Sequence, residues 1–303
     1  MIGHHLALVG TTASGKSALA FEVARARPDI EIVSVDSMQV YRGMDIGTAK
    51  PTTSERRTVP HHLIDIAEPD EEFTVARFQR AAHDAIAEID ARNHRALLVG
   101  GTGLYLRAVV DGLAIPGQYP EVVLELAGNT TGELHERLQA LDPVAAARME
   151  PSNRRRVLRA LEVTVGSGRP FSSFGPGLEA YPSTTFRLVG VTLPAPVVSA
   201  RIAERYERQL AEGFLDEVRA LAARERGLSR TAAQALGYRE LLAHVRGERL
   251  LDDAVDEAVR RTRQFARRQR AWFRRDPRIE WLAAEREPQE LLPSLLRVVS
   301  GQT

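Results

Sequence analysis

The sequence contains no cysteine. That absence excludes disulfides, zinc sites built on thiolates and cysteine nucleophiles, so any metal ion has to be held by oxygen or imidazole groups. An apolar run long enough to span a bilayer is also missing. The first expected strand begins within six residues of the start, which leaves no room for a signal peptide. We therefore expect a cytoplasmic protein that has no membrane partner.

Lysine is nearly absent as well. Of the 41 basic side chains, only Lys16 and Lys50 are lysines, and the formal net charge is +1. A codon bias toward arginine replaces lysine at positions where either cation is acceptable. The two remaining lysines therefore indicate positions that need a compact ammonium group. Lys16 lies in the phosphate-binding motif described next. Lys50 marks residues 47–51 as a second candidate functional segment, unless this lysine merely escaped the bias.

An apolar strand pattern at residues 6–9 leads directly into the pattern G-x-x-x-x-G-K-S, which is typical of a phosphate-binding P-loop. The glycines let backbone N–H groups close around a phosphate. A helix that starts near Ser14 directs its positive end at the phosphate, and Lys16 adds a mobile cation. Ser17 is placed to hold Mg²⁺. The residues that we predict to bind a di- or triphosphate are Gly10, Thr11, Thr12, Ala13, Ser14, Gly15, Lys16 and Ser17.

Strand and helix patterns alternate on both sides of one interruption. Strands are expected at residues 6–9, 30–35, 62–66, 96–99 and 186–193, and a helix capped by Thr74 at 74–91. This alternation predicts an α/β fold, in which a P-loop NTPase-like parallel sheet is flanked by helices. Between 114 and 184 the pattern breaks, with turn-rich flanks around a helical centre at 131–165. We predict a core domain of residues 1–113 and 185–303, mostly helical after the last strand, and a small helical insertion domain at 114–184.

Polar or glycine-rich clusters follow three of these strands, at Gly10, Asp36 and Gly100, and in a parallel sheet they should converge at one edge. Asp36 is followed by a hydroxyl at Ser37 and an amide at Gln39, a combination that can position a nucleophile and take its proton. A P-loop with a parallel sheet is most often found in a kinase or NTPase. A small-molecule kinase that transfers a γ-phosphate to a hydroxyl held by Asp36 is therefore one interpretation.

One late helix, expected at residues 253–275, is unusually rich in arginine. Arg260, Arg263, Arg267, Arg270 and Arg274 recur at steps of three or four residues, while apolar side chains occupy the other face. A basic stripe of this kind is the footprint expected for a polyanion such as nucleic acid. The alternative is an arginine-rich surface helix with acidic partners.

Taken together and in order, eight segments resemble the tRNA dimethylallyltransferases over nearly the whole chain. They are GTTASGKS at 10–17, SVDSMQVY at 34–41, GMDIGTAKP at 43–51, PHHLID at 60–65, VGGTGLY at 99–105, DPVAAAR at 142–148, RALEV at 159–163 and TRQFARRQ at 262–269. The resemblance implies transfer of a dimethylallyl group from its diphosphate to N6 of the adenosine on the 3′ side of the anticodon, with release of diphosphate.

The same resemblance implies roles for individual residues. The P-loop, with Lys16, Ser17 and Mg²⁺, would neutralise the leaving diphosphate, and we expect Arg205 to be a further ligand of that diphosphate. Asp36 matches the catalytic base, with Thr102 beside it. The alternative role for Asp36 is an outer ligand of Mg²⁺, as in P-loop kinases.

For the RNA partner, the resemblance implies the anticodon stem loop of a tRNA, with the adenine swung out into a pocket. The implied tRNA contacts are Asp36, Ser37, Met38, Gln39, Thr102, Arg155, Arg156, Val157, Leu158, Arg159, Gln234, Ala235, Leu236, Gly237, Tyr238 and Arg239. For the arginines at 155, 156 and 159 the alternative is a salt-bridged surface helix. We expect a monomer, and a non-catalytic RNA-binding protein with a degenerate nucleotide site is the third interpretation.

Overall fold

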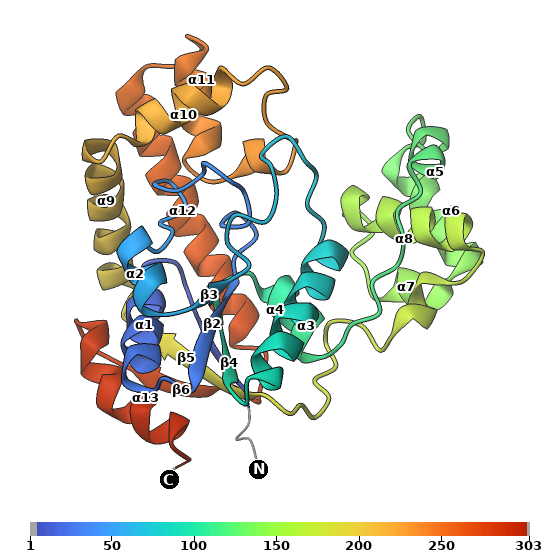
Figure 1. The fold of residues 1–303 in the computed structure, drawn as a ribbon. Helices are drawn as coiled ribbons and strands as arrows, with labels where there is room; N and C mark the ends of the chain where they lie inside the picture. Colours follow the sequence, from blue (N-terminus) through green and yellow to red (C-terminus); the bar gives the residue numbers. More distant parts are fainter. Residues whose placement is uncertain (1–4, 302–303) are drawn as a thin grey trace. The chain divides into compact units, whose positions relative to one another are not determined.

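A computed structural model describes residues 5–301 and divides the chain into two compact units (Figure 1). One unit comprises Met1–Asp111 and Ser183–Thr303, and the other comprises Gly112–Pro182. The predicted boundaries of the insertion, 114 and 184, lie two residues further along the chain. Each unit has its own set of buried apolar residues.

The larger unit is built on a six-stranded sheet in the order β3-β2-β4-β1-β5-β6, in which every neighbouring pair is parallel. The strands are β1 (Leu6–Gly10), β2 (Ile30–Val35), β3 (His61–His62), β4 (Arg95–Gly100), β5 (Arg187–Thr192) and β6 (Glu280–Ala283). The strands β1, β2 and β4 are buried at every residue, because helices cover both faces of a parallel sheet. The predicted fold class is confirmed.

Helices flank this sheet as predicted (Figure 1). They are α1 (Lys16–Ala26), α2 (Thr53–Thr58), α3 (Val75–Ala91), α4 (Gly103–Val110), α9 (Ala195–Ala211), α10 (Phe214–Ala222), α11 (Tyr238–Val245), α12 (Leu251–Phe273) and α13 (Leu292–Val299), with short 3₁₀ turns at Ala232–Gln234 and Pro288–Leu291. The predicted cap of α3 is confirmed, because the side chain of Thr74 accepts a hydrogen bond from the backbone N–H of Arg77.

Three local predictions are wrong. The strand expected at 62–66 is reduced to His61–His62, because Leu63 and Asp65 have positive φ angles of 64° and 58°, which an extended strand does not allow. The strand β6 was not predicted: it is only four residues long, with exposed residues at both ends and two half-buried residues between them. The helix α1 begins at Lys16 rather than near Ser14, and Gly15 precedes it in the left-handed conformation.

Helix α12 presents a continuous buried seam to the rest of its unit. The seam is formed at steps of four or three residues by Ala254, Ala258, Thr262, Ala266, Gln269 and Phe273. Small residues at these positions let the helix approach its neighbours closely. The hydroxyl of Thr262 is bonded to that of Tyr206, at 2.8 Å.

The smaller unit is helical, as predicted, but its centre is not one continuous helix. It contains α5 (Pro120–Glu125), α6 (Thr131–Leu141), α7 (Pro143–Ala147), α8 (Arg154–Ser167) and a 3₁₀ turn at Phe171–Phe174. Asp142 ends α6 and caps α7 by accepting from the N–H of Ala145, and Pro143 follows it at a first helical position. The core of this unit is small and apolar, and Val122, Leu126, Leu134, Leu138 and Leu161 lie in it.

A charged group is buried at the opposite end of the sheet from the P-loop. The carboxylate of Glu31, at the start of β2, is only 3% exposed and accepts hydrogen bonds from Arg92, at 2.8 and 2.9 Å. It also bonds His62 Nε2 at 2.7 Å and His94 Nδ1 at 2.8 Å. Burial alone would raise the pKa of Glu31, but the bonds from Arg92, His62 and His94 outweigh it and lower the pKa from 4.5 to about 2.

We predict that Glu31→Gln lowers the free energy of unfolding by about 3 kcal/mol at pH 7, because it removes the charge that these partners surround. The native pKa is depressed, so the stabilisation is present above the ordinary carboxyl pKa of 4.5 and is lost as pH falls toward 2. Urea unfolding of both proteins from pH 7 to pH 3.5 measures this, with exposed Glu88→Gln as the control. A difference that stays constant down to pH 3.5 would contradict the assignment.

Candidate active site

The carboxyl ends of β1, β2 and β4 bring the three predicted clusters together at one edge of the sheet. Gly100, at the end of β4, pairs with Val9 on one side and with Val35 on the other. A Cβ atom at Gly100 would lie 2.0 Å from the carbonyl oxygen of Val35. Only glycine therefore permits this close approach, which places the turn before Thr102 between the P-loop and Asp36.

The P-loop has the geometry of a preformed anion cradle. Gly15 has φ +81°, and an added Cβ would lie 2.3 Å from Pro288, so no other residue fits without displacing the chain. Lys16 Nζ donates to the carbonyl of Thr11 at 3.2 Å, and Ser17 is exposed in the first turn of α1. The loop thus directs backbone N–H groups, an ammonium group and a hydroxyl toward the place where a phosphate would bind.

Two cations and one anion lie close together in this cradle. Burial lowers the pKa of Lys16 from 10.5 to about 8, the nearby Asp36 carboxylate opposes that shift, and the Arg205 guanidinium adds to it. Burial also lowers the pKa of Arg205. An anion bound between Lys16 and Arg205 would therefore remove a repulsion that the protein carries in its absence.

Helix α9 supplies the arginines of the cradle. Arg205 donates to the hydroxyl of Thr12 at 3.2 Å and to the carbonyl of Gly47 at 3.0 Å. Arg201, one turn earlier on the same face, donates from Nε to the carbonyl of Ala13 at 3.1 Å. The structure therefore brings Arg205 to the P-loop, where it was predicted, and places Arg201 there as well.

The Asp36 segment separates into groups that face the site and groups that hold the chain. Asp36 and Ser37 are half-buried at the end of β2, and Asp36 Oδ1 accepts from the N–H of Met38 at 2.8 Å. The amide of Gln39 is committed elsewhere, because it accepts from Ser34 Oγ at 2.7 Å and donates to the carbonyls of Thr48 and Ala49. Asp36 and Ser37 are thus the better placed to meet a substrate.

Lys50 has a buried side chain, and its ammonium group is bonded to the protein itself. Its side chain is 1% exposed, and Nζ donates to Tyr41 O at 2.5 Å, Asp65 Oδ1 at 2.6 Å and Asp45 Oδ1 at 2.7 Å. Arg56 completes the cluster with a 2.6 Å bond to Asp65. Lys50 therefore clamps the loop at 41–51 onto the segment that follows β3.

The same loop is held from its other side by helix α10. The carboxylate of Glu217 accepts from three successive N–H groups, those of Asp45 and Ile46 at 2.8 Å and that of Gly47 at 3.2 Å. Tyr238 donates its hydroxyl to Glu217 at 2.5 Å. Burial and the neighbouring Glu217 both raise the pKa of Tyr238, so its hydroxyl stays protonated and can donate. This arrangement fixes the carbonyl of Gly47 that receives Arg205.

The segment at 234–239 is only partly available to a partner. Ala235, Gly237 and Tyr238 are buried, and Gly237 needs its positive φ of 85° to turn into α11. Gln234 and Arg239 are exposed and bond to each other at 3.1 Å.

In the smaller unit, the arginines predicted to contact RNA fall into two kinds. Arg155 and Arg156 are exposed on α8, whereas Val157 is fully buried and Leu158 half-buried. Arg159 is bonded within its own unit, to Glu162 at 2.9 Å and to the carbonyl of Pro116 at 3.0 Å. For Arg159 the contacts are those of the salt-bridged alternative.

The basic stripe on α12 is also partly engaged in protein contacts. Arg263 donates to the carbonyl of Ser199 at 3.3 Å and Arg270 to that of Leu193 at 2.9 Å. Arg267 and Arg274 are exposed. The free positive charge therefore lies toward the C-terminal half of the helix.

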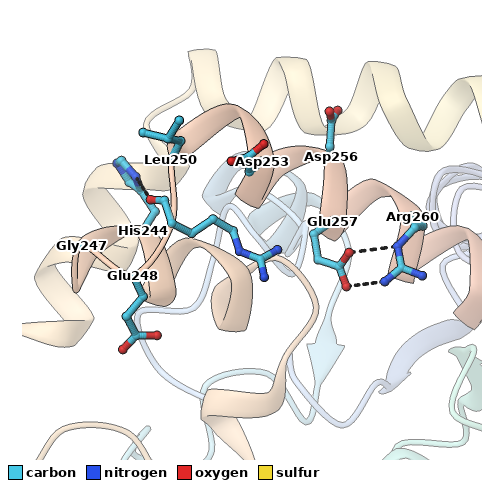
Figure 2. A pocket seen from close by; sticks show the side chains of 9 residues that line it. His244, Gly247, Glu248, Leu250, Asp253, Asp256, Glu257 and Arg260 are labelled. Atoms are coloured by element: carbon cyan, nitrogen blue, oxygen red, sulfur yellow. Dashed lines mark hydrogen bonds and ion pairs between the residues drawn. The ribbon is translucent and has the colours of Figure 1, made fainter.

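A wide groove of about 900 Å³ borders the N-terminal half of α12 (Figure 2). Figure 2 shows Glu257 bonded to Arg260 through both of its carboxylate oxygens, at 2.6 and 2.9 Å. Three further carboxylates line the groove, those of Glu248, Asp253 and Asp256. Because carboxylates repel phosphates, this end of the helix does not favour RNA.

Sequence reasoning assigned no role to Gln269, Trp272 or Glu217, all of which contact the loops of the site. Gln269 Oε1 accepts from the N–H of Thr12 at 2.8 Å, and its Nε2 donates to the carbonyl of Gly101 at 2.9 Å. Trp272 packs so closely on Gly103 that an added Cβ would lie 2.1 Å from its Nε1. Gln269 lies in the TRQFARRQ segment, but the sequence does not indicate that its side-chain amide bonds to the loops at Thr12 and Gly101.

A parallel α/β sheet with a P-loop, a carboxylate and clustered cations at one edge defines a P-loop enzyme that binds a substrate through its diphosphate or triphosphate. The family model "IPP transferase" matches residues 39–276. The chain is 48% identical to the tRNA dimethylallyltransferase of Geobacter metallireducens over 280 residues, which cover 90% of each chain. It is 48% identical to that of Salinispora tropica over 309 residues, which cover 98% of this chain and 95% of the relative. The chain belongs to the tRNA dimethylallyltransferase family.

Solved structures agree with this assignment. The full-length tRNA isopentenylpyrophosphate transferase from Bacillus halodurans is similar, with a TM-score of 0.72 and 36% identity over 99% of this chain and 96% of that one. A eukaryotic dimethylallyltransferase acting on tRNA shares the fold at a TM-score of 0.82 and 24% identity, covering 99% of this chain and 80% of that one. None of the helices that the structure describes combines the length and apolar character needed to cross a bilayer.

We predict that Lys50→Arg lowers the free energy of unfolding by about 2 kcal/mol, because a planar guanidinium group overfills the space enclosed by the three acceptors. Thermal or urea unfolding measures this change in the free energy of unfolding. The control is the reverse substitution, Arg57→Lys, at an exposed position where either cation fits. Equal stability of Lys50→Arg and the unchanged protein would show that no compact ammonium group is needed.

Proposed function

We propose that this protein transfers the dimethylallyl group of dimethylallyl diphosphate to N6 of the adenosine on the 3′ side of the tRNA anticodon. The observation that carries the proposal is that, in a member of this family, the strand register brings the P-loop and Asp36 to one edge of the sheet and Arg205 bonds to Thr12 of that loop. Lys16 and Arg205 bind and neutralise the diphosphate of the donor, and the carboxylate accepts a proton from the acceptor. Diphosphate is released.

The donor half of the site acts on the leaving group. As the bond between the allylic carbon and the diphosphate oxygen breaks, negative charge grows on that oxygen. Lys16, Arg205 and the N–H groups at the start of α1 would supply positive charge and hydrogen bonds to that oxygen as the charge develops. The half-buried Arg205 is restrained by Thr12 and Gly47, which limits the entropy lost on binding.

A Mg²⁺ ion fits the donor set that these residues offer. Among residues 5–301 no three His, Asp or Glu side chains converge as a metal site, so the ion would be held by the Ser17 hydroxyl, water and the diphosphate itself, as is usual for Mg²⁺. Bound there, the ion would supply further charge neutralisation for the leaving diphosphate.

The acceptor half of the site acts on the amine. The lone pair of N6 is delocalised into the adenine ring, so attack is helped when a base removes a proton as the new N–C bond forms. Asp36 is the proposed base, and its bond from Met38 to Oδ1 orients the carboxylate. Thr102 lies at the N-cap position of α4 without making a side-chain capping bond. Its hydroxyl is therefore able to contact the adenine, including the N6 amine that gives up its proton.

The RNA partner we propose is the anticodon stem loop of a tRNA, with its target adenine swung out of the stack at a cost of a few kcal/mol. Exposed Arg155 and Arg156 of the smaller unit, and exposed Gln234 and Arg239 of the larger one, are the proposed contacts. Arginine suits both phosphate contact and base stacking. We infer that the enzyme acts as a monomer in the cytoplasm.

The first prediction from this proposal concerns the reaction itself. Radiolabelled dimethylallyl diphosphate is expected to label unmodified tRNA in the presence of Mg²⁺ and without ATP. Asp36→Asn and Lys16→Ala should each lower the rate at least about 100-fold, since each removes one charge-assisted step, while tRNA affinity stays within about threefold. Filter binding measures the affinity, and mass spectrometry of digested tRNA locates the new group.

A folded protein that needs ATP and phosphorylates a small alcohol would instead establish the kinase alternative. Retention of tRNA by both the unchanged protein and Asp36→Asn, with no product from either, would establish a non-catalytic RNA-binding protein.

The second prediction concerns RNA contact by the smaller unit. The double variant Arg155→Gln with Arg156→Gln is expected to weaken tRNA binding. It should also reduce the magnitude of the slope of log association constant against log salt concentration by about 1 to 2, because fewer counterions are released when the protein contacts fewer phosphates. The matched control is Arg137→Gln in the same unit, where the guanidinium is already bonded to Glu125. An unchanged salt slope in the double variant would assign α8 to the salt-bridged surface alternative.

A further inference from the structure

Gln269 is a buried amide on the otherwise small and apolar seam of α12. Its relative exposure is 6%. A buried amide is costly unless its donor and acceptor are both satisfied, and here both partners are backbone groups. They are the N–H of Thr12, at 2.8 Å, and the carbonyl of Gly101, at 2.9 Å.

These partners belong to the two turns that carry the reacting groups. Thr12 lies in the P-loop, four residues before Lys16, and its hydroxyl receives Arg205. Gly101 directly precedes Thr102. One side chain therefore joins the donor half of the site to the acceptor half, and it does so from an element more than 160 residues away from either along the chain.

Glycine at 101 and 103 lets α12 approach the second turn closely. A Cβ atom at Gly101 would lie 2.2 Å from Gln269 Nε2, and one at Gly103 would lie 2.1 Å from Trp272 Nε1. Gln269 and Trp272 are three residues apart and so lie on one face of the helix. Thr102 is held between two glycines that both rest on this face.

Resting on the proposed function, we propose that Gln269 is a positioning residue that fixes the distance between the bound diphosphate and Thr102. Its acceptor keeps the N–H of Thr12 occupied, which holds the start of the P-loop open. Its donor holds the Gly101 carbonyl, which sets where Thr102 stands. Without the amide, each turn keeps its chain path, but nothing fixes the distance between the two turns. Dimethylallyl diphosphate then binds with its reacting carbon displaced from the acceptor half of the site.

The first test compares Gln269→Met, which keeps the size but removes both hydrogen bonds, with Gln264→Met on the same helix outside the buried seam. We expect Gln269→Met to raise the KM for dimethylallyl diphosphate and to lower kcat, each by about tenfold. The KM for tRNA should stay within about twofold, because the exposed side chains proposed to bind the RNA backbone are unchanged by the substitution. Gln264→Met should leave all three constants unchanged.

The second test uses Gln269→Glu and measures how its activity depends on pH. A simple loss of packing would not produce such a pH dependence. A protonated carboxyl can donate to Gly101 and accept from Thr12, as the amide does, whereas an ionised carboxylate only accepts and repels both Gly101 and the diphosphate. Activity of Gln269→Glu relative to the unchanged enzyme, measured at each pH, is expected to be within about threefold at pH 5.5 and to fall at least about tenfold by pH 8.

Three results would overturn the inference. The first is a kcat and a KM for dimethylallyl diphosphate that are the same in Gln269→Met and Gln264→Met, and the second is an equal rise in the KM for tRNA and in the KM for dimethylallyl diphosphate. The third is an activity of Gln269→Glu, relative to the unchanged enzyme, that does not change with pH. Failure of the proposed function is recognised separately, because the unchanged enzyme would then leave tRNA unmodified. In that case calorimetry with inorganic diphosphate still decides the inference, since Gln269→Met must bind this probe about tenfold more weakly than Gln264→Met does.

Discussion

The site depends on two cations held largely out of water beside a single carboxylate. Burial lowers the pKa of both Lys16 and Arg205, and the neighbouring Asp36 carboxylate offsets only part of that shift. A bound diphosphate would compensate the remainder, so donor binding and the arrangement of the protein favour each other. The fold makes this possible because the carboxyl ends of β1, β2 and β4 deliver the P-loop, Asp36 and Thr102 to one edge of the sheet.

Holding such charges in place requires a rigid surrounding, and side chains remote in sequence provide it. Lys50 clamps the loop at 41–51 through three acceptors, Glu217 accepts from three of its N–H groups, and Gln269 ties the P-loop to the Gly101 turn. The bonds of Glu217 and Gln269, and the bond from Lys50 to the carbonyl of Tyr41, satisfy backbone groups of these loops. The loops of the site are thus as firmly held as the strands they follow, which suits a reaction that depends on orientation.

Much of this could be predicted from the sequence where the signal is local. The P-loop is a contiguous pattern, and Thr74 caps α3 with its own side chain, so both follow from neighbouring residues. Two strands differ from the prediction, for different reasons. His61–His62 pairs with β2 for only two residues because Leu63 and Asp65 turn left-handed, and β6 forms because β5 offers an edge to a segment with little strand character of its own. The helical centre expected at 131–165 divides first at Asp142, which ends α6 and caps α7.

Patterns along the chain were enough to predict the phosphate loop, the alternation of strands and helices, the helical insertion and the resemblance that points to prenyl transfer. The fold was needed to show which arginines are exposed and which are bonded, how three acceptors enclose Lys50, and that Gln269 reaches both halves of the site. The physical reason is that burial and hydrogen-bond partners arise between segments far apart in the chain, and no local pattern specifies them.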